Sequence, residues 1–241
     1  MHWNAIPVIQ NPRRTLWLFA GLFAARQAFE ILWIVGMRTG FEISSVDGLV
    51  RITPVYVIQT AVLLLIMGRL GVLRRGHPPC ITACRPRWML AACTVVVAAQ
   101  VPAIVRNQAD YVYFQFDDYA AFLALGGLRM VFLDPLMQEI LFRGLLYEAL
   151  RNRGRLPAYI ISTAVYVATH VPFVALLVAG GSMLSMHTAV SLAVTGLTCA
   201  WVFHRTGRLF APVVVHMTAA ASTWYAPAAR YGLLLLQGGS L

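Results

Sequence analysis

Four polar side chains in the second half of the chain interrupt runs that are otherwise apolar. Glu139 and Arg143 are four residues apart, and His170 and His216 stand in two later apolar runs. Residues i and i+4 share one face of a helix, so the carboxylate and the guanidinium can pair. Burying a charge in hydrocarbon is costly, and such residues normally face a hydrated cavity and carry function. A carboxylate with two imidazoles can activate water and stabilise an oxyanion.

The composition indicates an integral membrane protein. Of the 241 residues, 59% are hydrophobic and 12% are charged, and the mean hydropathy is +0.70. An ordinary soluble domain is about 45–50% apolar and about 25% charged. We therefore predict an all-α, polytopic membrane helical bundle that forms a single integral membrane domain.

Apolar runs long enough to cross a bilayer divide the chain into seven predicted segments. These are 15–37, 53–73, 88–105, 119–150, 156–179, 184–203 and 209–236. Residues 1–118 thus contribute about three spans, and residues 119–241 hold the polar side chains. The run 119–150 is too long for one crossing. Asp134 suits an N-cap and Pro135 suits a first helical position, so a new helix is expected there after a shallow or broken segment. Seven or eight membrane helices result.

The basic residues predict the orientation. The net charge is +10, and all basic residues are arginines. They gather in alternate loops: Arg13 and Arg14; Arg74, Arg75, Arg85 and Arg87; Arg151, Arg153 and Arg155; Arg205 and Arg208. The intervening loops hold Glu42, Asp47, Asp110, Asp117 and Asp118 or no charge. The positive-inside rule explains this pattern better than nucleic-acid binding does, and it places the N-terminus in the cytoplasm. The lysine-free, arginine- and alanine-rich composition suggests a bacterial inner membrane, with the first run as an uncleaved span.

The depths of the polar groups are compatible with one site. Glu139, His170 and His216 lie about 12, 14 and 7 residues from the cytoplasmic loops, or roughly 18, 21 and 10 Å deep. They can meet if their helices are neighbours. Each alone could be structural, as an ion pair with Arg143 or as a hydrogen-bonded packing histidine.

Three segments resemble the motifs of a known family. Residues 134–144 are similar to the first motif of the CPBP (CAAX-protease and bacteriocin-processing, Abi) family of glutamic intramembrane endopeptidases, which has two glutamates, three further residues and an arginine. Residues 166–170 resemble its Phe-x-x-x-His motif, with tyrosine first, and residues 195–216 resemble its last region. The similarity covers about residues 119–225, which are expected to form the catalytic helical core.

The resemblance implies a hydrolase that cuts a membrane protein or peptide substrate, such as a C-terminal sorting tail, a peptide signal or a CAAX-like sequence. It implies no cofactor and no metal. A glutamate would activate water, and Arg143 would tune the pKa of that glutamate. His170 and His216 would orient the water and stabilise the oxyanion. The chain gives no indication of its oligomeric state.

Two positions depart from the family pattern. Gln138 replaces the first glutamate, and Ala220 replaces an asparagine or aspartate. An amide cannot accept a proton at neutral pH, so Gln138 cannot be a general base. Either Glu139 takes that role, or the chain is an attenuated, protease-like membrane binding or immunity protein.

Two further alternatives remain open. Two histidines and a carboxylate could hold zinc in a metalloprotease, although the chain has no His-Glu-x-x-His motif, and His77, Cys80 and Cys84 lack a fourth ligand nearby. Buried ionisable groups also mark ion paths in transporters. A single polar cluster and the absence of an inverted sequence repeat argue against a transporter. Cys93 and Cys199 are expected only to pack in apolar surroundings.

Overall fold

The computed structural model describes residues 11–38, 46–69, 86–107, 119–170 and 186–236. These residues are helical almost throughout and contain no strand, which confirms the predicted all-α fold. Several residues named above lie outside these ranges, namely Arg74, Arg75, Arg85, His77, Cys80, Cys84, Glu42, Asp110, Asp117 and Asp118.

The helices follow the predicted apolar runs. They are α1 (Pro12–Arg38), α2 (Val46–Arg69), α3 (Pro86–Asn107), α4 (Tyr119–Gly127), α5 (Asp134–Glu139), α6 (Glu148–Arg151), α7 (Arg155–Thr169), α9 (Met186–Thr206) and α10 (Phe210–Leu236). Within the described residues, no helix combines the length and the apolar character needed to cross a bilayer. The helical part of the prediction is thus confirmed, and the membrane-spanning part is not.

Residues 119–151 form one continuous rod, so the predicted break before Asp134 is wrong. Two π-helical stretches, Leu128–Leu133 and Ile140–Tyr147, join α4, α5 and α6. Helix α5 begins at Asp134 as expected, but Leu133 and Asp134 both keep right-handed helical backbone angles. Proline inside an α-helix removes a hydrogen bond and crowds the preceding turn. We attribute the unbroken course of the rod to the wider π-helical turns, a feature often found at functional sites.

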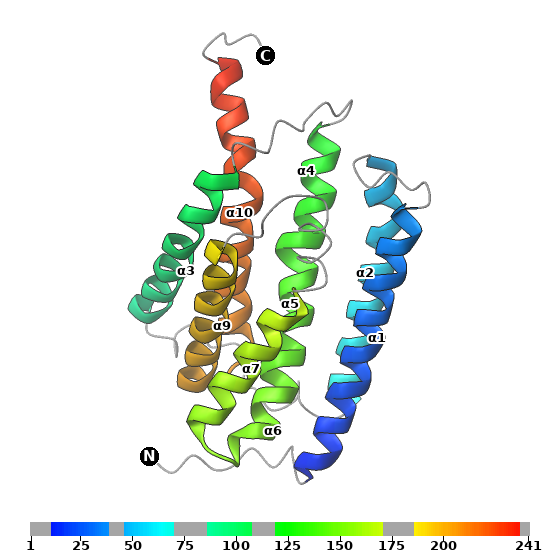
Figure 1. Cartoon of the computed structure of the whole chain (residues 1–241), viewed down its shortest axis with the longest axis vertical. Coiled ribbons are helices and arrows are strands. Elements are labelled where there is room, and N and C mark those ends of the chain that lie inside the picture. The colour runs from blue at the N-terminus through cyan, green and yellow to red at the C-terminus, as the bar shows by residue number, and fades with distance from the viewer. Residues whose placement is uncertain (1–10, 39–45, 70–85, 108–118, 171–185, 237–241) are drawn as a thin grey trace.

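The rod occupies the middle of the molecule, between two groups of helices (Figure 1). Helices α3, α9 and α10 pack against one another on one side, and α1 and α2 lie on the other. Helix α7 packs against α9 and against the π-helical stretch Ile140–Tyr147. The start of α1, the end of α6, the start of α7 and the end of α9 point to the same end of the molecule, the lower end in Figure 1. Arginines therefore gather at that end.

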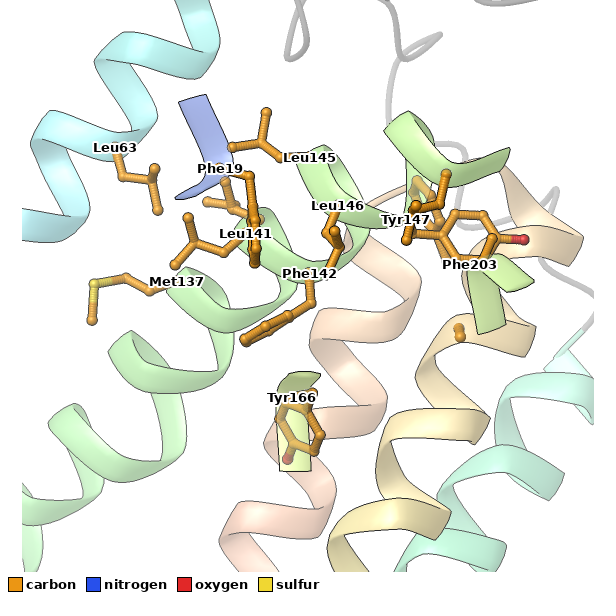
Figure 2. Packing of buried hydrophobic residues seen from close by; sticks show 14 of the residues in the cluster. Phe19, Leu63, Met137, Leu141, Phe142, Leu145, Leu146, Tyr147, Tyr166 and Phe203 are labelled. Atoms are coloured by element: carbon orange, nitrogen blue, oxygen red, sulfur yellow. The ribbon is translucent and has the colours of Figure 1, made fainter. Parts of the chain in front are cut away.

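An aromatic core holds the π-helical stretch between α1 and α7. Phe142 is 1% exposed, and its ring lies 5.9 Å from Phe19 and 6.4 Å from Phe23 on α1, both edge-on. On the other side it meets Tyr166 of α7 at 5.6 Å, and Figure 2 shows this packing. Edge-to-face aromatic pairs contribute about 0.5–1.5 kcal/mol each beyond the area they bury. The turn that carries Arg143 is thereby fixed from two sides.

Two polar contacts tie the first two helices to the rod. Nη2 of Arg26 on α1 lies 3.4 Å from Oδ1 of Asp134. On α2, the hydroxyl of Tyr56 accepts a hydrogen bond of 2.9 Å from Arg129, whose guanidinium also lies 4.4 Å from the Tyr56 ring centroid. These contacts fix the rod immediately before Glu139.

Close approach of α4 to α10 depends on glycine, which leads to a first prediction. A Cβ atom at Gly126 would overlap the ring of Trp224, whereas a Cβ at Gly21 on α1 would meet nothing within 4 Å. We expect Gly126→Leu to lower the free energy of unfolding by about 1–3 kcal/mol relative to Gly21→Leu, the usual cost of overpacking. Chemical denaturation of the purified variants checks this. Equal stability of the two variants would mean that Trp224 and α10 move away from a larger side chain at position 126 without a cost in stability.

Candidate active site

The site centres on the Glu139 carboxylate, at the junction of α5 and the π-helical stretch that follows. Glu139 and Arg143 are both fully buried, and Oε2 of Glu139 lies 3.2 Å from Nε of Arg143. The predicted i, i+4 pair is therefore confirmed. The other carboxylate oxygen, Oε1, lies 2.8 Å from Nδ1 of His216 on α10. The first motif and the last region of the family pattern thus meet at one carboxylate.

Tyr166 completes the environment of His216. Its hydroxyl lies 3.2 Å from Nε2 of His216, and the tyrosine is buried. One assignment satisfies both contacts: Nδ1–H donates to Glu139, and Nε2 accepts from the tyrosine hydroxyl. A hydrogen bond at one ring nitrogen sets the role of the other. His216 is thereby held in a fixed orientation toward the carboxylate.

Arg143 is anchored across the helices as well as to Glu139. Its Nη2 donates a hydrogen bond of 2.6 Å to the carbonyl oxygen of Gly196 on α9. A Cβ at Gly196 would lie 2.9 Å from Cγ2 of Thr163 and 3.1 Å from Cδ1 of Tyr166. Where α9 crosses α7, a larger residue than glycine would therefore displace the Thr163 or Tyr166 side chain. The crossing in turn brings the carbonyl within reach of the guanidinium.

His170 lies beside this cluster and contacts it through Tyr166. It caps α7, where Nδ1 lies 3.0 Å from the carbonyl oxygen of Tyr166 and 3.1 Å from Oγ1 of Thr169. Its ring centroid is 4.9 Å from that of Tyr166, and the Tyr166 ring also lies 5.5 Å from that of His216. When Nδ1–H donates to the carbonyl oxygen, the lone pair of His170 is on Nε2. The structure thus brings Arg143 and His216 each into direct contact with Glu139, and His170 into contact with Tyr166 beside them.

Several buried polar atoms at the site have no hydrogen-bond partner among the described residues. They include Oε1 of Gln138 and Nη1 of Arg143. Buried polar atoms are normally hydrogen-bonded, and leaving one unpaired costs about 1–3 kcal/mol. Nη1 of Arg143 can donate to a peptide carbonyl oxygen or to water, and Oε1 of Gln138 can accept from a peptide N–H or from water. Gln138, which cannot accept a proton, can still orient such a group through its amide.

The interpretation of the sequence missed two residues of the site. Tyr166 was recognised only as a motif position, although its difference from the family's phenylalanine adds the hydroxyl that contacts His216. Cys199 was expected only to pack. It is fully buried, and its thiol, a carboxylate oxygen of Glu139 and a ring nitrogen of His216 all lie within 4.8 Å of one another. Three such atoms could hold a metal ion.

The comparison with known families matches the part of the chain that carries these residues. Residues 120–222 match the family model described as Type II CAAX prenyl endopeptidase Rce1-like. The matched segment runs from α4 into α10 and contains the residues of the site. It is consistent with the resemblance to the CPBP family inferred from the sequence motifs, which is thereby confirmed. No curated protein and no solved structure matches the chain.

Proposed function

We propose that this chain, whose residues 120–222 belong with the Rce1-like CAAX endopeptidases, is an intramembrane endopeptidase that uses Glu139 to activate water. The family implies a protease, that is, a hydrolase of peptide bonds. One observation supports this mechanism: the carboxylate of Glu139 is fully buried and contacts the guanidinium of Arg143 and the imidazole of His216. Such an arrangement is costly to bury and suits acid–base work in a water-poor site.

In the proposed mechanism, Glu139 accepts a proton from water as the oxygen attacks the peptide carbonyl carbon. Each carboxylate oxygen has two acceptor positions, so Glu139 can hold water while contacting its two partners. Nη1 of Arg143, which has no hydrogen-bond partner among the described residues, can donate to the oxyanion. Nε2 of His170, which carries the lone pair, can accept a hydrogen bond from the attacking water and orient it. Glu139 then returns the proton to the amide nitrogen as the C–N bond breaks. The products are a new carboxyl group and a new amine.

A membrane setting for this chemistry is supported by the distribution of side chains. Large apolar side chains are exposed on several helices, including Ile58 (62%), Leu65 (63%), Leu90 (71%) and Val190 (55%), while the charged pair is buried. Extensive exposed apolar surface marks contact with a membrane or another protein. The Rce1-like family is membrane-embedded in general. We place the arginine-rich end on the cytoplasmic side of a bacterial inner membrane, with a membrane-associated protein or peptide as substrate.

Co-expression with a candidate substrate tests the proposal. The first candidate is a small protein encoded next to this one, with a short C-terminal apolar tail followed by arginines. We expect two fragments by mass spectrometry, and the new carboxyl terminus should carry one heavy oxygen when cleavage occurs in heavy-oxygen water. An intact peptide that co-purifies without any fragments would favour the non-catalytic binding alternative, which Gln138 and Ala220 motivate.

The cluster of Glu139, Cys199 and His216 gives the zinc alternative a ligand set different from the one predicted. The guanidinium of Arg143 argues against it, because a fixed positive charge 3.2 Å from Glu139 would repel a bound cation. We therefore expect cleavage to be unchanged after exhaustive chelation, and unchanged in Cys199→Ser. Elemental analysis of the active protein is the accompanying measurement. Loss of cleavage on chelation, restored by Zn²⁺, would establish the metalloprotease.

A further inference from the structure

A second site lies on the face of α9 that points away from Glu139. An apolar groove of about 360 Å³ runs between α3 and α9, next to the start of α7. Its lining includes Trp88, Ala91 and Val95 of α3, Leu197 and Trp201 of α9, and Tyr159 of α7. Trp88, Val95 and Leu197 are between 44% and 48% exposed. The groove is therefore open along its length.

The two tryptophans close one end of the groove, and each carries an arginine. The rings of Trp88 and Trp201 meet edge-on at 5.8 Å. The guanidinium of Arg87 lies 5.4 Å from the Trp88 ring, and that of Arg205 lies 6.0 Å from the Trp201 ring. Both arginines are exposed. The groove lining contains no acidic residue, so this end presents two positive charges next to apolar surface.

A third arginine contributes to the same positive end. Arg155 begins α7 and is exposed, one helical turn before Tyr159, which lines the groove. From there the groove follows α3 from Trp88 to Val95, roughly 10 Å at 1.5 Å per residue. A ligand that fits this surface has an anionic head and an apolar chain.

We propose that this groove binds an anionic phospholipid, with its phosphate between Arg87 and Arg205 and an acyl chain along α3 and α9. Tryptophan and arginine are the residues that proteins place at the headgroup level of a membrane. Basic pockets between helices on the cytoplasmic side bind anionic headgroups. The inference rests on the membrane setting of the proposed function. It does not depend on proteolysis.

The groove also adjoins the active site through α9. Leu197 lines the groove, and the preceding residue, Gly196, supplies the carbonyl that accepts the hydrogen bond from Arg143. A lipid packed between α3 and α9 would support α9 in the position that holds this carbonyl toward the guanidinium. Lipid binding would thereby stabilise the arrangement around Glu139.

Native mass spectrometry of the purified chain in detergent tests the proposal, using phosphatidylglycerol and phosphatidylcholine with identical acyl chains. The wild type should retain phosphatidylglycerol preferentially. Replacing both Arg87 and Arg205 by alanine should weaken its retention about 30-fold, at about 1 kcal/mol per arginine. The control is Arg13→Ala with Arg14→Ala, which removes the same charge at the start of α1 and should leave retention unchanged. Ala91→Trp, at an exposed position, should fill the groove and displace both lipids.

Equal retention of the two lipids by the wild type would overturn the proposal. An equal loss of phosphatidylglycerol retention in the Arg87/Arg205 variant and in the Arg13/Arg14 control would also overturn it. Displacement of phosphatidylglycerol by a substrate peptide would assign the groove to substrate instead. Because no cleavage is measured, a protein that binds the lipid but cuts nothing would leave this inference standing while the proposed function fails. A protein that cleaves its substrate but retains the two lipids equally would leave the proposed function standing while this inference fails.

Discussion

Glu139→Gln is expected to lower the rate of substrate cleavage by a factor on the order of 10³, the usual range for loss of a general base. The amide keeps the size of the side chain and can still accept a hydrogen bond from Nδ1 of His216. It cannot accept the proton that water must lose. The measurement is a single-turnover cleavage rate with purified protein, accompanied by a melting temperature to show that the variant folds.

Glu148→Gln is the matched control for this substitution. Glu148 lies on the same rod, and its carboxylate pairs with Arg151, where the two side chains are 18% and 29% exposed. The chemical change is identical, but the carboxylate is outside the cluster. We expect cleavage within about twofold of the wild type, because substitutions away from such features usually change little. Equal losses in both variants would indicate a general effect of charge on the rod.

The Gln138→Glu substitution tests whether position 138, the family's first glutamate position, can supply the general base. Neighbouring residues on a helix point about 100° apart, so a carboxylate at 138 reaches a different part of the site. In the Glu139→Gln background, recovery of cleavage on adding Gln138→Glu would mean that position 138 can supply the base. If Glu139→Gln alone cuts at the wild-type rate, the proposed role of Glu139 is wrong and the carboxylate is structural.

The sequence predicted those parts of the molecule that depend on local periodicity. Apolar runs located the helices, because a long apolar segment has few other ways to satisfy its backbone hydrogen bonds. The i, i+4 spacing predicted the pairing of Glu139 with Arg143, which follows from helix geometry alone. The catalytic roles of these residues, and of His170 and His216, stay predictions.

The parts that the sequence did not predict depend on contacts between distant helices. Nothing in an apolar run specifies which of its side chains faces which neighbour, so Cys199 was expected only to pack. The sequence predicted depths for both histidines that are compatible with one site, and it did not distinguish their roles. In the structure, His216 contacts Glu139 directly, whereas His170 caps α7 and packs against the Tyr166 ring. The continuous rod was missed for another reason: Asp134-Pro135 is a strong local start signal, and the π-helical turns that accommodate it have no comparable pattern.

Arg143→Leu is expected to lower the free energy of unfolding by about 3–5 kcal/mol, the cost of leaving a buried charge without its partner. The substitution removes the positive charge 3.2 Å from Glu139 and the hydrogen bond to the Gly196 carbonyl oxygen. The control is Arg151→Leu, in which the same change breaks a partly exposed pair. Such pairs contribute about 0–1 kcal/mol. Chemical denaturation in detergent provides the comparison.

A double-substitution cycle separates the charge effect from the loss of packing. If the unpaired carboxylate causes the instability, adding Glu139→Gln to Arg143→Leu should recover part of the lost stability, because a neutral amide is less costly to bury than an isolated charge. If the loss arises from packing and from the Gly196 contact, the double variant should be no more stable than Arg143→Leu alone. Equal destabilisation by Arg143→Leu and Arg151→Leu would mean that the Glu139 carboxylate is well solvated. The buried ion pair from which the mechanism starts would then be absent from the folded protein.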